Sequence, residues 1–283
     1  MSVRVRDLLM RELDTLRYEP IDKRIRAAIG AETVIDSTRA MLVWEPKRVV
    51  PTYAVPVEDV AGEILSEPRT ETGDVEDHGV PPMGAPQLAG RIVFDPSVPF
   101  AVRTTEGDPL AIEAGGRRAA AFRAADAALA GYVIVDFDAF DAWWEEDERN
   151  VGHPRDPFHR IDIVRSSRHV RVELDGELLA ESREPHMLFE PPLPVRYYLP
   201  AEDVRTDRLT PSDTRTFCAY KGEASYLSLE GEADIAWTYP APLREAAIVT
   251  DRIAFFDERV DLVVDGTRIE RPVTPWSPRR PER

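Results

Sequence analysis

Apolar and polar residues alternate with a period of two along most of the chain, which is typical of strands with one buried face. Residues 169–180 alternate around Asp175-Gly176, a dipeptide that favours a two-residue hairpin turn. A second alternating run, 259–264, ends in the same Asp-Gly dipeptide. The 25 prolines keep the elements short. This pattern predicts a mainly β protein with few short helices.

Helical spacing of apolar residues is confined to two places. Residues 5–16 carry apolar side chains at helical intervals, and the alanine-rich residues 117–129 are expected to be partly helical.

Two parts of the chain resemble each other. Residues 34–60 and 179–204 share Ser, Glu-Pro, Tyr, Pro and Glu-Asp-Val in the same order, and residues 107–122 have the spacing of 222–237. The self-similarity predicts two tandem copies of one small compact β domain.

The expected domain boundaries follow from this comparison: an N-terminal helix in 1–22, a first, diverged domain in 23–150, an inter-domain segment in 151–167 and a well-preserved second domain in 168–283. The first copy holds an insertion near 66–99 that is rich in Pro, Gly and acidic residues. We interpret the insertion as a mobile surface loop, with a lid over a site as the alternative.

Composition narrows the class of protein. The net charge of −16 argues against nucleic-acid binding, because phosphates need clustered basic residues. Cys218 is the one cysteine, so an intrachain disulfide is impossible and a thiolate-rich zinc site is not expected.

Apolar runs are too short to span a membrane and no secretory signal is evident, so we expect a soluble cytoplasmic protein. Phosphate-loop, dinucleotide-binding and nucleophile-elbow motifs are missing, and no cofactor is predicted.

Several short motifs resemble a bacterial and fungal family, the domain of unknown function numbered four hundred and twenty-seven, sometimes labelled nucleotidyltransferase-like. They are Glu190-Pro191 and residues 196–200, 218–222, 236–240 and 254–256; residues 143–148 and 153–162 resemble tandem actinobacterial members. The resemblance implies a compact, mainly β domain and no mechanism that maps onto residues. Ala219 replaces the proline usual in the family, and the first copy has Glu106 where the second has Lys221.

Lys221 and Cys218 are the candidate catalytic residues. A lysine three positions after a cysteine can stabilise a thiolate, and a partly desolvated lysine can act as a Schiff-base nucleophile or a phosphate clamp. Alternatively, Cys218 is a small buried hydrophobe and Lys221 pairs with a carboxylate. The first copy cannot share any chemistry that Lys221 performs.

Glu190, Arg196 and Tyr198 are candidate substrate-binding residues beside Lys221. A buried Glu190 needs a cationic partner, which Arg196 or Lys221 can supply. Because the first copy keeps Glu45-Pro46, the alternative is that Glu190 serves the fold.

Residues 153–162 hold the candidate ligand contacts Arg155, His159 and Arg160. Prolines extend this segment and separate its two histidines, so no metal site is predicted. We expect a clasp in which Arg155 and Arg160 pair with acidic residues of 145–148 and lock the domains, with an anion site as the alternative.

Four aromatic residues can stack on a planar ligand or pack in the core: Trp143, Trp144, Trp237 and Tyr239. The first functional hypothesis is therefore a small-molecule binding or transfer protein, enzymatic or not, whose site in the second domain takes an anionic or carbonyl-bearing ligand. The second is a non-catalytic module that binds a protein partner.

Overall fold

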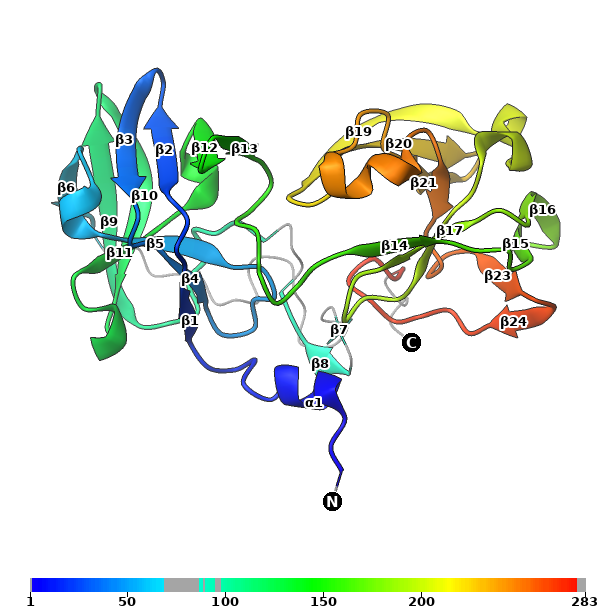
Figure 1. The fold of residues 1–283 in the computed structure, drawn as a ribbon, viewed down its shortest axis with the longest axis horizontal. Helices are drawn as coiled ribbons and strands as arrows, with labels where there is room; N and C mark the ends of the chain where they lie inside the picture. Colours follow the sequence, from blue (N-terminus) through cyan, green and yellow to red (C-terminus); the bar gives the residue numbers. More distant parts are fainter. Residues whose placement is uncertain (1, 69–86, 89, 95–97, 279–283) are drawn as a thin grey trace. The chain divides into compact units, whose positions relative to one another are not determined.

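The computed structural model describes residues 2–68, 87–88, 90–94 and 98–278 (Figure 1). The chain folds into two compact units. The first comprises Met1–Ala85 and Arg91–Asp156, and the second Pro86–Gly90 and Pro157–Arg283. The change from one unit to the other at residue 157 falls inside the expected inter-domain segment.

The first unit is built almost entirely from strands. Its elements are α1 (Val5–Leu9), β1 (Arg17–Pro20), β2 (Ile25–Ile29), β3 (Glu32–Ser37), β4 (Met41–Trp44), β5 (Thr52–Pro56), η1 (Val57–Asp59), β6 (Glu63–Ser66), β8 (Arg91–Ile92), β9 (Gly107–Ala114), β10 (Arg117–Ala124), η3 (Ala127–Leu129), β11 (Tyr132–Val135), η4 (Phe137–Ala139), β12 (Ala142–Glu145) and β13 (Glu148–Asn150). They form a seven-stranded sheet in the order β1-β4-β5-β11-β10-β9-β6 and a four-stranded sheet in the order β13-β12-β2-β3. The two sheets enclose an apolar core that contains Ile25, Tyr53, Ile112 and Trp143.

The second unit has the elements β7 (Gln87–Leu88), β14 (Asp162–Arg165), β15 (Val170–Leu174), β16 (Glu177–Ser182), β17 (His186–Phe189), β18 (Arg196–Tyr198), η5 (Ala201–Asp203), η6 (Thr206–Arg208), β19 (Thr210–Cys218), β20 (Gly222–Leu229), β21 (Glu232–Thr238), η7 (Arg244–Val249), β22 (Ile253–Phe255), β23 (Asp261–Val264) and β24 (Thr267–Ile269). Its sheets run β14-β17-β18, β19-β20-β21-β22 and β16-β15-β23-β24. Leu199, just after β18, bridges Ile253 of β22 and so joins the first two of these sheets.

The strand orders of the two units match element by element. With the bridge between β18 and β22, the second unit reads β14-β17-β18-β22-β21-β20-β19, which parallels β1-β4-β5-β11-β10-β9-β6. The order β24-β23-β15-β16 parallels β13-β12-β2-β3 in the same way. Registers agree too, since Thr52 lies opposite Val43 on β4 and Arg196 lies opposite Leu188 on β17.

The predicted hairpins are present. β15 and β16 pair across Asp175 and Gly176, which both have positive φ, at 51° and 83°. β23 and β24 pair across the second Asp-Gly dipeptide, whose residues have φ of 51° and 78°. Asp and Gly tolerate this backbone region better than most residues, which is why the turns could be located from sequence.

The helix predictions were less accurate. The N-terminal helix ends at Leu9 instead of continuing to residue 16. Residues 117–124 form the strand β10, and only Ala127–Leu129 make a short 3-10 turn. β10 pairs with β9 along its whole length and buries Ala119, Ala121 and Phe122. Sheet pairing has therefore overridden the intrinsic helix preference of alanine.

The insertion is only partly described, because residues 69–86, 89 and 95–97 lie outside the described residues. Its beginning and end do not match the expected solvated loop. Ser66 closes strand β6, and Phe94 and Val98 are buried in a small cluster with Val102. These apolar side chains pack because burying them removes hydrocarbon surface from water.

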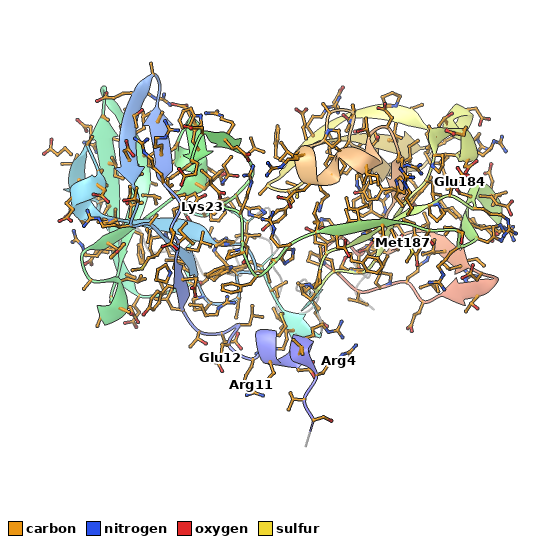
Figure 2. The ribbon with its side chains drawn as sticks, viewed as in Figure 1. Arg4, Arg11, Glu12, Lys23, Glu184 and Met187 are labelled. Carbon is orange, nitrogen blue, oxygen red and sulfur yellow. The ribbon has the colours of Figure 1, made fainter. Side chains whose placement is uncertain are left out.

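Side chains fill the space between the sheets of each unit (Figure 2). In the second unit Met187 of β17 is buried, whereas Glu184 in the preceding turn is exposed. No helix in the described part of the chain is long and apolar enough to cross a membrane.

Candidate functional site

A buried ion pair joins two loops of the second unit. Glu190 directly follows β17, and Lys221 lies in the turn between β19 and β20. The Lys221 Nζ donates a short hydrogen bond to Glu190 Oε2, and the two residues are 8% and 9% exposed. Gly222 shapes this turn with a φ of +93°, and a Cβ added there would lie 3.4 Å from Leu243. The lysine predicted to be functional is therefore paired with the glutamate predicted to need a cation.

Both members of the pair are charged at neutral pH. Burial alone would raise the pKa of Glu190, but Lys221 and His159 outweigh it and lower that pKa to about 2. Burial likewise favours the neutral amine, yet Cys218 and Glu190 raise the pKa of Lys221 well above its usual value. A protonated amine cannot attack a carbonyl, so the arrangement favours Lys221 as a fixed positive charge.

His159 contacts the other oxygen of the same carboxylate. Its Nε2 lies 3.4 Å from Glu190 Oε1, and its side chain is 23% exposed. The imidazole stacks on Tyr220 at 6.1 Å between ring centroids. The Arg160 guanidinium also lies over Tyr220, 4.9 Å from the ring centroid. Glu190 therefore connects a buried cation with a histidine that solvent reaches.

Two buried aromatic residues, Tyr198 and Tyr239, lie near Lys221. Tyr198 is 1% exposed, and its hydroxyl accepts a hydrogen bond from the indole of Trp237 at 3.0 Å. Burial raises the pKa of Tyr198 to about 12 and that of Tyr239 well above its usual value, so both phenols are neutral. Trp237 and Tyr239 belong to the core cluster of this unit, and Cys218 is half-buried at the end of β19.

Arg196 does not contribute to this site, contrary to one of the sequence hypotheses. Its guanidinium makes two hydrogen bonds to Glu258, at 2.6 and 2.8 Å, and lies 3.5 Å from Asp257. All three residues are at least nine-tenths buried. Asp257 and Glu258 were not among the predicted site residues, although two acids directly after the apolar run 253–256 are a usable signal for buried charge.

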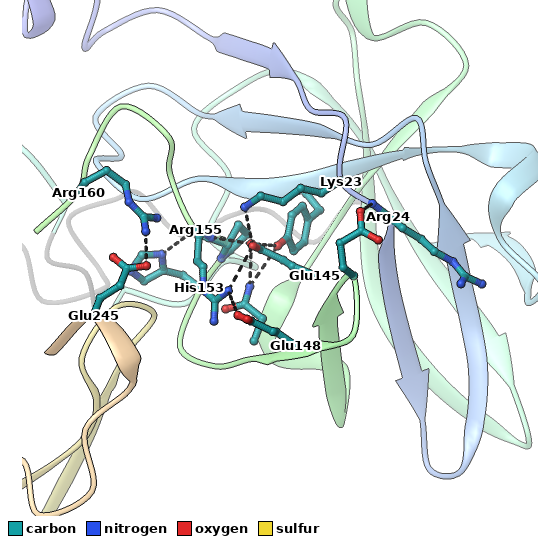
Figure 3. Close-up of polar contacts among 12 residues, drawn as sticks. Lys23, Arg24, Glu145, Glu148, His153, Arg155, Arg160 and Glu245 are labelled. Carbon is teal, nitrogen blue, oxygen red and sulfur yellow. Dashed lines mark hydrogen bonds and ion pairs between the residues drawn. The ribbon is translucent and has the colours of Figure 1, made fainter. Parts of the chain in front are cut away.

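The two arginines of the predicted clasp have different partners. The Arg155 backbone N–H donates to Glu145 at 3.1 Å, and its guanidinium donates to Glu148 at 3.0 Å (Figure 3). These are two of the expected partners, but all three residues belong to the first unit. In the second unit Arg160 forms an ion pair with Glu245 of η7 instead of residues 145–148. The prediction was wrong for Arg160, because Glu245 belongs to the same unit and lies within hydrogen-bonding distance.

Glu145 is the centre of a second polar cluster that sequence analysis did not identify. Lys23 Nζ donates to its carboxylate at 2.6 Å, and the Tyr53 hydroxyl donates at 2.7 Å (Figure 3). The Asn150 amide donates to the same hydroxyl at 3.1 Å. Each buried oxygen of Glu145 thus has donors, as a stable buried carboxylate requires.

The first unit has its own version of the Glu190 pair. Glu45 follows β4 as Glu190 follows β17, and it accepts hydrogen bonds from Arg103 and from the Thr104 backbone N–H, both at 2.8 Å. Arg103 occupies the position of Cys218, counted back from the glycine that begins β9 or β20, whereas Glu106 occupies that of Lys221 and is exposed. The buried glutamate is thus kept and its cation comes from a different sequence position.

Among the described residues no group of three or more His, Cys, Asp or Glu side chains is placed to hold a metal ion. His153 contacts the carbonyl of Pro154, and His159 contacts Glu190. A surface pocket of the second unit is lined by Asp261, Arg268, Ile269, Glu270 and Arg271, and Lys221 is not part of its lining.

The sequence model of a family described as "Domain of unknown function (DUF427)" matches residues 162–266. This match supports the family for that segment, which includes Glu190, Arg196 and Lys221, while His159 lies three residues before it begins. No curated protein matches the chain. The family description names no reaction, so any function must be argued from the site itself.

Proposed function

We propose that the second unit, whose residues 162–266 match this family of unknown function, binds a small anionic or carbonyl-bearing molecule at the edge of the Glu190–Lys221 pair. The observation that carries the proposal is the position of His159. It is a partly exposed imidazole held by a buried carboxylate that Lys221 keeps ionised. A histidine oriented in this way presents a ring nitrogen or ring edge that can hydrogen-bond a ligand.

Comparison with the first unit supports a role beyond folding. The matching strand orders lead us to propose that the units are tandem copies of one domain. In the first copy Glu45 is satisfied by Arg103 and Thr104, which are adjacent in one loop. In the second copy Glu190 instead divides its oxygens between a buried lysine and a solvent-accessible histidine. His159 thus fills the place of the second donor, which in the first copy is a backbone N–H, and it brings a side chain that solvent reaches to the carboxylate.

Arg160 supplies the positive charge that an anionic ligand requires. Its side chain is 41% exposed and stacks on Tyr220, the same ring that His159 contacts. Its partner Glu245 is also partly exposed, and exposed ion pairs are worth only about 0–1 kcal/mol, so a ligand carboxylate or phosphate can compete for the guanidinium. Lys221 does not contact the ligand in this proposal. It is a positioning residue, because it holds the Glu190 carboxylate that contacts His159.

A thermal-shift screen with carboxylated and phosphorylated metabolites tests this proposal. A ligand at a hundredfold excess over its Kd adds about 2.7 kcal/mol of stability, which shifts Tm by several degrees. We expect a shift for the wild type that is lost in His159→Gln. His169→Gln is the matched control, because His169 also pairs with a glutamate of the second unit, Glu181 at 2.7 Å. The proposal is overturned if no compound shifts Tm, or if the shift survives His159→Gln.

A protein-interaction module is the second candidate, favoured by two observations. Phe158 and Phe217 are 67% and 56% exposed, and Lys221 is already paired with Glu190. Under this alternative no small molecule changes Tm, and Phe217→Ser abolishes association with a protein partner without altering Tm.

Two further proposals rest on sequence alone. The single cysteine is the ground for proposing a cytoplasmic location. The motifs in residues 143–148 and 153–162 are the ground for proposing the actinobacterial tandem type.

A further inference from the structure

The second unit buries a cluster in which acidic groups outnumber basic ones. Arg196 of β18 faces Asp257 and Glu258, which lie in the turn between β22 and β23. The three side chains are 8%, 8% and 0% exposed. One guanidinium cannot neutralise two ionised carboxylates, so this cluster carries excess negative charge when both acids are ionised.

The C-terminal strap, residues 272–278, closes over this cluster. Thr274 is 5% exposed, and its hydroxyl donates a hydrogen bond to Glu258 Oε1. The Trp276 ring lies 6.0 Å from the Arg196 guanidinium carbon. Within the strap, the Thr274 N–H donates to Ser277 Oγ and the Trp276 N–H donates to Thr274 Oγ1. The strap thus inserts one hydroxyl into the charged cluster and covers the guanidinium with an indole.

Asp257 decides the net charge beneath the strap. The charged and titratable groups that face it are Arg196 and Tyr197 of β18 and Glu258 of its own turn. When Asp257 is protonated, Arg196 and Glu258 balance each other. When Asp257 ionises, a second negative charge is buried beside the carboxylate that holds Thr274.

We propose that the C-terminal strap is a pH-sensitive element, docked on the Arg196 cluster at mildly acidic pH and progressively released as the pH rises to neutrality. Burial raises the pKa of Asp257 to about 7, against the opposing effect of Arg196, so this carboxyl titrates in the required range. Release admits water to the cluster, which lowers the cost of the second charge.

The corresponding positions of the first unit keep only one acid of this cluster, Asp138 in the place of Glu258. Thr52 matches Arg196 in register, and Phe137, two residues after β11, matches Asp257, two residues after β22. Thr52 donates to the Val135 carbonyl at 2.6 Å, and Phe137 is buried against Trp143. The first unit therefore forms the same strand order without an arginine at the position of Arg196 and without an acid at the position of Asp257.

Hydrogen exchange of residues 272–278 between pH 5 and 9, corrected for the intrinsic dependence of exchange on pH, tests this proposal in the full chain. By linkage, opening of the strap becomes about tenfold more favourable for each pH unit between about 4 and about 7, and it levels off above 7 because Asp257 is then ionised in both states. Asp257→Asn should keep the strap protected at every pH. Asp265→Asn, which removes an exposed acid of the same unit, should behave as the wild type.

A second variant, Thr274→Val, keeps the proposal testable if Asp257→Asn does not fold. Thr274→Val removes the bond to Glu258 and should leave the strap unprotected at both pH 5 and pH 9, with Tm measured in parallel. Constant protection of the wild-type strap from pH 5 to 9 overturns the proposal. Unchanged pH dependence in Asp257→Asn, or full strap protection in Thr274→Val, overturns it as well.

Discussion

Replacing Lys221 by methionine tests the electrostatics of the candidate site most directly. Methionine has similar length and no charge, so Glu190 keeps its surroundings and loses its principal cation. In the native protein the pKa of Glu190 falls from 4.5 to about 2. Each pH unit corresponds to about 1.4 kcal/mol, so the environment of the ionised carboxylate contributes roughly 3 kcal/mol at pH 7. Breaking a buried pair by removing one partner costs about 3–5 kcal/mol, which is consistent with that value.

The pH dependence of the loss follows from the direction of each pKa. The wild type has the full contribution of Glu190 above pH 4.5 and loses it as the pH falls through about 2. In Lys221→Met, burial without the lysine raises the Glu190 pKa above its unfolded value, so this variant gains stability on acidification. The difference between the two proteins should therefore be largest near pH 7 and shrink towards pH 4.

Urea denaturation of both proteins at pH 7, 5 and 4 measures these free energies, with equal m-values as the check that the transition is comparable. The double variant Lys221→Met with Glu190→Gln should recover part of the loss, because the uncompensated charge is gone. Arg205→Met is the control, since Arg205 pairs with Asp207 at the surface and its replacement should not change stability measurably. A loss below about 1 kcal/mol at pH 7, or a loss that does not shrink at pH 4, would refute the reasoning.

Three further predictions concern buried charge and the backbone. The pKa of Asp257 is raised from 3.8 to about 7, so wild-type stability should fall by roughly 2.5 kcal/mol between pH 5 and pH 8; Asp257→Asn should abolish this fall, and urea denaturation at the two pH values measures it. Arg103→Met should cost the first unit about 3 kcal/mol, because Glu45 is then left with a single backbone donor; the first unit's unfolding transition in urea reports it. Gly222→Ala should cost about 1–3 kcal/mol, because alanine resists a φ of +93°, and calorimetry should show Tm lowered by several degrees.

The sequence by itself determined the features that depend on local backbone preference. Alternation with period two predicted the mainly β fold, and Asp175-Gly176 located a hairpin because these residues tolerate positive φ. The recurring Glu-Pro motif also identified the carboxylates at the ends of β4 and β17. These signals lie within a few residues of the structure that they produce, so one sequence suffices to find them.

Tertiary structure alone decided the partners of the buried charges. Arg196 pairs with Glu258, which is 62 residues away, and not with Glu190, which is six residues away. Residues 117–124 became a strand because β9 was available to pair with them. A charge or a hydrogen-bonding group interacts strongly only across a few ångströms, and those distances are set by which strands become neighbours. Periodicity fixes the face on which a side chain lies, whereas the order of the strands fixes what it meets there.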